Sequence, residues 1–140
     1  MAEVIARRTM MDRRLGKAEF RSAGTSTVPG LPASAGAQRA VRRHGLTLED
    51  HSSTSLSHDA VDWADLILTM GPSHLSRVLE LGGGGKSALL GAYAGGIDDA
   101  LEPAVLDPVG GGDETYEATF LTLEAMVTAA LERLSREEAG

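Results

Sequence analysis

One stretch of six residues, 65–70, constrains the fold of this chain more than any other. It reads Asp-Leu-Ile-Leu-Thr-Met, and four of its six side chains are apolar. A short apolar run between Asp65 and the Gly71-Pro72 turn is typical of a strand that is covered on both faces. Such strands belong to parallel sheets, because the connections between parallel strands place helices against both faces. The stretch therefore predicts an α/β protein.

Segments of helical and extended character alternate along the rest of the chain. Ser34 and Ser57 are suited to cap helices, and Gly45 is suited to end one. We predict helices over residues 1–14, 34–44, 57–63 and 73–81, and short strands over residues 20–25 and 88–90.

Apolar residues recur with a 3.6-residue period after residue 113 and predict a long amphipathic helix over residues 113–136. Its stripe consists of Tyr116, Phe120, Leu123, Val127, Ala130, Leu131 and Leu134. Shorter stripes are predicted at Val4, Ile5, Arg8 and Met11, and at Leu75, Val78, Leu79 and Leu81. Helices that alternate with strands indicate a three-layer α/β/α sandwich around a small parallel sheet. The chain has no repeats and no linker, so residues 1–140 are predicted to form a single domain.

A loop between the last strand and the last helix carries one aspartate in a distinctive setting. Asp107 is followed by Pro108 and then by three glycines. Proline fixes its own φ and favours extended backbone in the residue before it, so Asp107 is predicted to lie on a defined loop. Ligands of parallel sheets bind beyond the carboxyl ends of the strands, where this loop is expected. An ordinary turn before a helix explains the same residues.

The composition excludes several kinds of site. There is no cysteine among the 140 residues, which rules out disulfides, thiolate metal sites and a cysteine nucleophile within them. The four histidines lack paired-ligand spacing, so we expect neither a metal nor a cofactor. No apolar run is long enough for a membrane span, and no signal peptide is recognisable. We expect a cytoplasmic protein with no membrane association.

Charge is distributed unevenly along the chain. Residues 1–43 carry nine Lys/Arg against three Asp/Glu, whereas the remainder carries four against seventeen. A basic first third is one signal of nucleic-acid binding. Its basic residues fall on two separate helical patterns without interleaved aromatic residues, which favours ordinary solvated helix faces and no nucleic-acid partner.

Six blocks in order carry a resemblance that covers almost the whole chain. They are MAEVIA at residues 1–6, SAGT at 22–25, HGL at 44–46, DH at 50–51, ADLILTM at 64–70 and DPVGG at 107–111. In this order the blocks resemble the low-molecular-weight protein-tyrosine phosphatases, and the last block is most similar to the bacterial branch that includes protein-arginine phosphatases. The resemblance implies the flavodoxin-like fold of that family and hydrolysis of phosphorylated protein side chains or of a small phosphate ester.

The resemblance also implies a mechanism and site residues. In the family a cysteine thiolate at a helix N-terminus attacks phosphorus, an arginine clamps the phosphate, and a cysteinyl-phosphate forms. Asp107 matches the aspartate that protonates the leaving group and then deprotonates water. Ser22 and His51 match residues that support the phosphate-binding loop by hydrogen bonds.

One departure from the family is severe. The C-x₅-R-[ST]-P loop, with the strand that precedes it, would stand directly before Met1 and is absent. We therefore expect an N-terminally incomplete domain that lacks its first strand, is inactive as given and is marginally stable. A start site assigned too late explains this, and a pseudophosphatase with a binding or regulatory role is the alternative.

Two smaller features bear on the substrate and on phosphate binding. Val109 and Gly110 stand where phosphotyrosine-selective members often carry aromatic residues, which favours phosphoarginine or a small ester. Residues 82–86 read Gly-Gly-Gly-Gly-Lys, but they follow a predicted helix and enter a strand. Because a phosphate-binding P-loop needs the opposite order, we do not expect one here.

Overall fold

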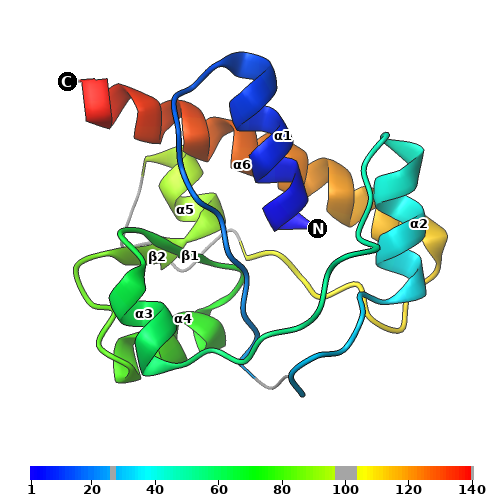
Figure 1. The fold of residues 1–140 in the computed structure, drawn as a ribbon, viewed down its shortest axis with the longest axis horizontal. Coiled ribbons are helices and arrows are strands. Elements are labelled where there is room, and N and C mark those ends of the chain that lie inside the picture. Colours follow the sequence, from blue (N-terminus) through cyan, green and yellow to red (C-terminus); the bar gives the residue numbers. More distant parts are fainter. Residues whose placement is uncertain (26–27, 97–103, 140) are drawn as a thin grey trace.

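The computed structural model describes residues 1–25, 28–96 and 104–139. Figure 1 shows their arrangement. In chain order the elements are α1 (Ala2–Arg13), α2 (Ala35–Arg43), α3 (His58–Trp63), β1 (Ile67–Thr69), α4 (Pro72–Glu80), β2 (Ser87–Leu89), α5 (Leu90–Gly95) and α6 (Asp113–Ala139). The predicted alternation of helices and strands is confirmed.

The two strands form a small parallel sheet between layers of helices. β1 pairs with β2 in the register Ile67↔Ser87, Leu68↔Ala88 and Thr69↔Leu89. Helix α4 makes the crossover between them, and in Figure 1 α3 and α4 lie on one side of the strands while α5 and α6 lie on the other. The fold is therefore α/β with helices on both faces of the sheet, as predicted.

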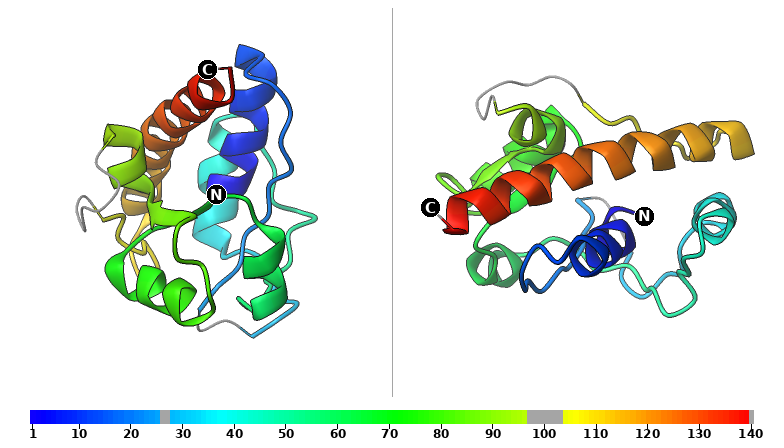
Figure 2. Two further views of the ribbon diagram at one scale, coloured as in Figure 1. Left: turned by 90° about the vertical axis from the view of Figure 1, so that its left-hand side faces the viewer. Right: turned by 90° about the horizontal axis from the view of Figure 1, so that it is seen from above.

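Helix α6 runs the length of the molecule and forms one wall of the core. Its predicted stripe is confirmed: Phe120 is fully buried, six of the seven positions are buried, and Leu134 is partly buried. Figure 2 shows α1 and α2 packed against one side of α6 and α5 against the other. None of the helices in the described part of the chain combines the length and the apolarity needed to cross a bilayer.

Serine caps begin two helices where the sequence predicted them. The Ser34 hydroxyl accepts a hydrogen bond from the Ala37 N–H, and the Ser57 hydroxyl accepts one from the Ala60 N–H. Each hydroxyl satisfies an amide that the first helical turn leaves without a partner. Both caps fix helix starts to within a residue of the prediction.

The uneven charge of the chain is explained by ion pairs that join its first third to α6. Four arginines of the basic segment reach acidic side chains on α6, at N–O distances of 2.9–3.2 Å. The pairs are Arg8–Glu124, Arg13–Glu132, Arg39–Asp113 and Arg43–Glu117. The two halves of the charge asymmetry therefore face each other across the contacts of α6 with α1 and α2.

Several details differ from the sequence-based expectations. Met11 and Leu79, both assigned to apolar stripes, are 74% and 51% exposed, because Met10 and Val78 take the inward positions of α1 and α4. Residues 20–25 were predicted as a strand, but the structure has only an isolated parallel bridge there, between Gly24 and Ser55. Helix α5 was not predicted at all.

Strand β1 was predicted to be a central strand, but in the described residues it is paired on one edge only. Its Ile67 N–H donates to the Lys86 carbonyl at 2.8 Å. Alternate residues of a parallel strand bond to the same neighbour, so the Leu68 backbone groups point to the opposite edge. No strand pairs with that edge in the described ranges, and Ile67 and Leu68 are only partly buried. The prediction of a strand covered on both faces is thus only partly met.

Candidate active site

The loop that carries Asp107 begins at the carboxyl end of β1. The Val105 N–H donates to the carbonyl of Met70, directly after β1, at 2.7 Å. Asp107 follows two residues later and is exposed. Its Oδ1 accepts a hydrogen bond from the Val109 N–H at 3.0 Å, and the Gly111 N–H donates to the Pro108 carbonyl at 2.9 Å. The loop thus presents one carboxylate to solvent at the end of the sheet where ligands of parallel sheets bind.

The other end of this loop is held by contacts between the start of α6 and α2. Asp113 forms an ion pair with Arg39 at 2.9 Å. The Tyr116 hydroxyl lies 3.2 Å from the Ser34 hydroxyl, and the Tyr116 ring packs against Gly36. A Cβ at Gly36 would lie 2.4 Å from the ring, so only glycine allows this approach. The Asp107 loop is therefore anchored to β1 before it and to α2 after it.

Ser22 is tied to the first turn of α1. Its hydroxyl donates to Glu3 Oε1 at 2.9 Å, and the other oxygen of Glu3 pairs with Arg7 at 2.9 Å. Arg7 in turn donates to the Phe20 carbonyl at 2.9 Å. The extended segment around Ser22 is thus fastened to the amino end of α1, where helix N–H groups can bind an anion.

His51 lies in the connection between α2 and α3 and is partly buried. The backbone N–H of His51 donates a hydrogen bond to the Leu48 carbonyl at 3.1 Å. Hydrogen bonds of Gly24 with Thr54 (2.8 Å) and Leu56 (2.9 Å) join this connection to the segment that carries Ser22.

The structure therefore groups the predicted residues in two parts. Ser22 and His51 lie on neighbouring segments, and Asp107 lies on a separate loop. In the part of the chain that the structure describes, no hydrogen bond or ion pair joins Asp107 to either of them. Glu3 and Arg7, which hold the Ser22 segment, were not predicted; their spacing of four residues was the available signal.

Burial affects one ionisable group near this region. Desolvation lowers the pKa of the Met1 ammonium below its ordinary value, and the Glu3 carboxylate opposes that shift. In Figure 1 the amino end of α1 lies in the middle of the molecule.

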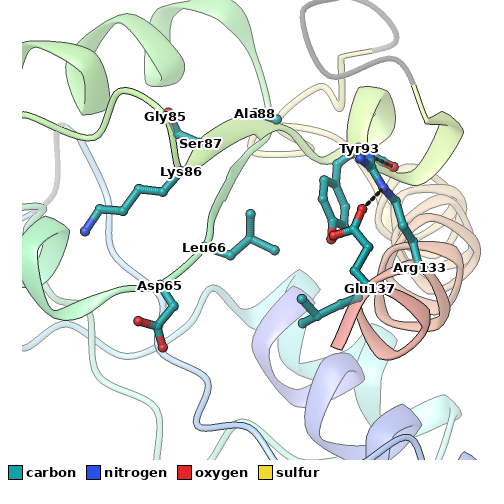
Figure 3. Close-up of a pocket in the computed structure, with 10 residues that line it drawn as sticks. Asp65, Leu66, Gly85, Lys86, Ser87, Ala88, Tyr93, Arg133 and Glu137 are labelled. Atoms are coloured by element: carbon teal, nitrogen blue, oxygen red, sulfur yellow. Dashed lines mark hydrogen bonds and ion pairs between the residues drawn. The ribbon is translucent and has the colours of Figure 1, made fainter. Parts of the chain in front are cut away.

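A hollow of about 330 Å³ lies at the opposite end of the sheet (Figure 3). Asp65 and Leu66 precede β1 there, and Lys86 precedes β2. Across the hollow, Arg133 pairs with Glu137 at 2.7 Å. Ligands of parallel sheets bind at the carboxyl ends of the strands, so we do not regard this hollow as the candidate active site.

Lys86, which follows the four glycines, has a structural role. Its ammonium donates to the carbonyls of Val61 and Ala64 at the end of α3. A cation at the carboxyl end of a helix satisfies carbonyls that lack helical partners. This agrees with the expectation that the glycine run is not a phosphate-binding loop.

A comparison with known protein families shows to which family this chain belongs. The family described as low molecular weight phosphotyrosine protein phosphatase matches residues 1–139. The chain belongs to this family. This match confirms the resemblance found in the sequence. Members of this phosphatase family are phosphoric monoester hydrolases.

The matches to relatives cover most of this chain. A protein-arginine-phosphatase of Geobacillus stearothermophilus is 28% identical over 129 residues, which are 91% of this chain and 84% of the relative. The low molecular weight protein-tyrosine-phosphatase Etp of Escherichia coli K12 is 27% identical over 91% of this chain and 83% of its own. Both tyrosine and arginine phosphatases are thus among the similar proteins.

A solved structure of the YwlE arginine phosphatase has a similar fold. It is a cysteine-to-serine mutant with a phosphorylated active-site serine. The TM-score is 0.84 at 27% identity, with 95% of this chain and 85% of that chain covered. The described chain therefore shares the α/β fold of this phosphatase relative.

Proposed function

We propose that Asp107 is the general acid and base of a phosphatase reaction at the carboxyl end of β1. The observation that carries this proposal is the anchored loop, which holds one exposed carboxylate beyond the strand. Ser22 supports the proposal because its segment is fastened to the amino end of α1, where a phosphate-binding loop would lead into the helix. In this proposal Ser22 and His51 support that loop.

The proposed chemistry has two steps. In the first, a thiolate attacks phosphorus, the bond from phosphorus to the leaving oxygen or nitrogen breaks, and Asp107 gives its proton to the leaving atom. In the second, the Asp107 carboxylate takes a proton from water as the water oxygen attacks phosphorus and the thiolate departs. Inorganic phosphate and the unmodified side chain are the products.

The 140 residues contain no cysteine and therefore cannot supply this thiolate. We propose that the catalytic unit includes a strand and a cysteine-bearing loop outside these residues, and that the strand pairs with the free edge of β1. The Leu68 backbone groups, which point to the unpaired edge of β1, support this proposal. The 140 residues alone are expected not to hydrolyse p-nitrophenyl phosphate.

The test uses an extended chain, in which the in-frame sequence encoded upstream precedes Met1. If that sequence lacks the C-x₅-R-[ST]-P motif, the corresponding segment of the Geobacillus relative takes its place. We expect the extended chain to hydrolyse aryl phosphates, and Asp107→Asn to reduce kcat by about 10²–10⁴-fold. The loss is expected to be larger with phenyl phosphate than with p-nitrophenyl phosphate, because the poorer leaving group depends more on a proton.

Glu114→Gln is the matched control for this experiment. Glu114 is an exposed carboxylate in the first turn of α6, and its side chain has no hydrogen bond or ion pair among the described residues. The control removes a negative charge close to the loop without touching the proposed acid. Equal rates for Asp107→Asn and Glu114→Gln would contradict the role of Asp107.

The substrate class follows from the side chains around Asp107. Leu106 is 82% exposed, and no aromatic residue follows Pro108 before Tyr116, which is buried. Without an aromatic side chain beside a substrate ring, we favour phosphoarginine or a small ester over phosphotyrosine. A higher kcat/KM for a phosphoarginine peptide than for the matched phosphotyrosine peptide is expected, and the reverse order would contradict this assignment.

A second function is favoured by the lack of cysteine. A chain that works with these 140 residues alone would be a pseudophosphatase that binds phosphorylated partners without hydrolysis. Capture of phosphopeptides by the 140-residue chain, with their unphosphorylated forms as control, would favour this alternative.

The cytoplasmic location expected from the sequence stays a prediction.

A further inference from the structure

The Asp107 side chain is held in one orientation by a backbone amide two residues away. Asp107 is exposed, and its χ1 torsion would be free to populate several rotamers without a partner. The Val109 N–H donates to Oδ1 at 3.0 Å, as in an Asx turn. We propose that Val109 is a positioning residue whose amide commits Oδ1 and leaves Oδ2 to carry and transfer the proton. This inference rests on the proposed function of Asp107.

The direction of the Val109 amide is set by a β-turn over residues 108–111. The Gly111 N–H donates to the Pro108 carbonyl at 2.9 Å, and Gly110 has a φ of 88°. A left-handed residue at the third position of such a turn is characteristic of type II, in which the second position has a φ near −60°. Val109 occupies that second position, so its N–H is fixed relative to Asp107.

The loop that contains the turn is attached to two secondary-structure elements. The Val105–Met70 hydrogen bond ties the loop to the end of β1, and the Asp113–Arg39 ion pair ties it to α2. Oδ1 is therefore oriented relative to the sheet as well as within the loop. A general acid must lie within hydrogen-bond reach of the leaving atom, so this orientation decides whether the proton can be delivered.

The proton transfer then involves a defined atom. Oδ1 accepts the Val109 hydrogen bond in both protonation states, whereas Oδ2 bears the proton in the acid form. When the bond from phosphorus to the leaving atom breaks, its electron pair stays on that atom and takes the proton from Oδ2. The resulting carboxylate uses Oδ2 again to accept a proton from the attacking water.

The turn geometry permits a substitution that removes the donor and keeps the backbone. Proline is favoured at the second position of a type II turn because its φ is already near the required value. Val109→Pro therefore deletes the N–H while retaining the turn. Val109→Ala is its partner, since it also removes the valine side chain but keeps the amide.

The first experiment uses the 140-residue chain and does not depend on catalysis. The amide proton shift of Val109, followed by NMR against pH, is expected to change as the Asp107 carboxyl ionises. The change should be absent in Asp107→Asn. A Val109 amide shift that does not follow the ionisation of Asp107 would show that the hydrogen bond does not exist in solution and would overturn the inference.

The second experiment uses the extended chain with phenyl phosphate. Val109→Pro is expected to have a kcat about tenfold below that of Val109→Ala, because a misoriented acid loses part of its contribution. KM should be the same in both variants, since the phosphate contacts are unchanged. Equal kcat values, with turnover still dependent on Asp107, would overturn this inference alone. Turnover independent of Asp107 would instead overturn the proposed function and this inference with it.

Discussion

Gly36 shows how a single residue controls the packing between α2 and α6. The Tyr116 ring packs so closely on Gly36 that an added Cβ would lie only 2.4 Å from the nearest ring carbon. Gly36 is buried, so the ring has little freedom to withdraw. The glycine is therefore required by a close approach of an aromatic ring and not by its backbone torsions.

We expect Gly36→Ala to lower the free energy of unfolding by about 1–3 kcal/mol, because an added methyl group overpacks this contact. Urea denaturation followed by circular dichroism measures the change. Gly95→Ala is the control, since Gly95 lies in α5 and, beyond its chain neighbours and its own helix backbone, no described atom is within 4 Å of its added Cβ. If both substitutions had the same effect, the packing of Tyr116 on Gly36 would not be the cause.

At the scale of elements, α2 and α6 are also joined by a group that titrates. Glu117 accepts hydrogen bonds from the His44 ring and from Arg43, which lower the pKa of its carboxyl below the ordinary value of 4.5. The His44 ring is stacked on Phe120 with ring centroids 4.0 Å apart. The imidazole therefore lies between the carboxylate at the surface and the core of the molecule.

A pH-dependent stability follows from the lowered pKa of Glu117. A carboxyl whose pKa is lower in the folded than in the unfolded state stabilises the fold above its unfolded pKa, and this stabilisation disappears as the pH falls through the folded value. Wild type should thus be more stable than Glu117→Gln above about pH 5, with the difference vanishing in more acidic solution. Urea unfolding of wild type and Glu117→Gln at several pH values measures this difference in the free energy of unfolding. A difference that persists at low pH, or a similar pH dependence for Glu114→Gln, would contradict it.

Elements with a strong local signal were predictable from the sequence, and those formed by distant contacts were not. The cap of Ser34 and the long stripe of α6 are local patterns, and both are confirmed. Helix α5 has six residues, two of them glycine, and its Tyr93 is held by Arg133 and Glu137 from the far end of the chain. Such a helix depends on tertiary contacts that no sequence window contains.

The same limit applies to the candidate site. Asp107 was identified by its local Asp-Pro-Gly context, but its hydrogen bond from Val109 requires coordinates. The contact of Ser22 with Glu3 spans 19 residues and has no sequence signature. The roles assigned to Asp107, Ser22 and His51 stay predictions until the extended chain has been assayed.

For the whole molecule, the two-stranded sheet limits stability. No strand of the described residues pairs with the second edge of β1, to which the Leu68 backbone groups point, and Ile67 and Leu68 are only partly buried. We expect the 140-residue chain to unfold thermally below about 50 °C or without a sharp transition, and the extended chain to unfold at a higher temperature. Differential scanning calorimetry of the 140-residue chain and of the extended chain measures the two unfolding temperatures. A cooperative transition of the 140-residue chain above 50 °C would show that the sheet is sufficient as it stands.

The ion pair between Arg13 and Glu132 joins residues that are 119 positions apart. Helix α1 leaves the ribosome well before its partner α6. At the usual speed of translation, the interval between these two residues is roughly 6–24 s. During that time the buried face of α1 lacks the helix against which it packs in the folded structure, so α1 can reach its final packing only when synthesis is almost complete.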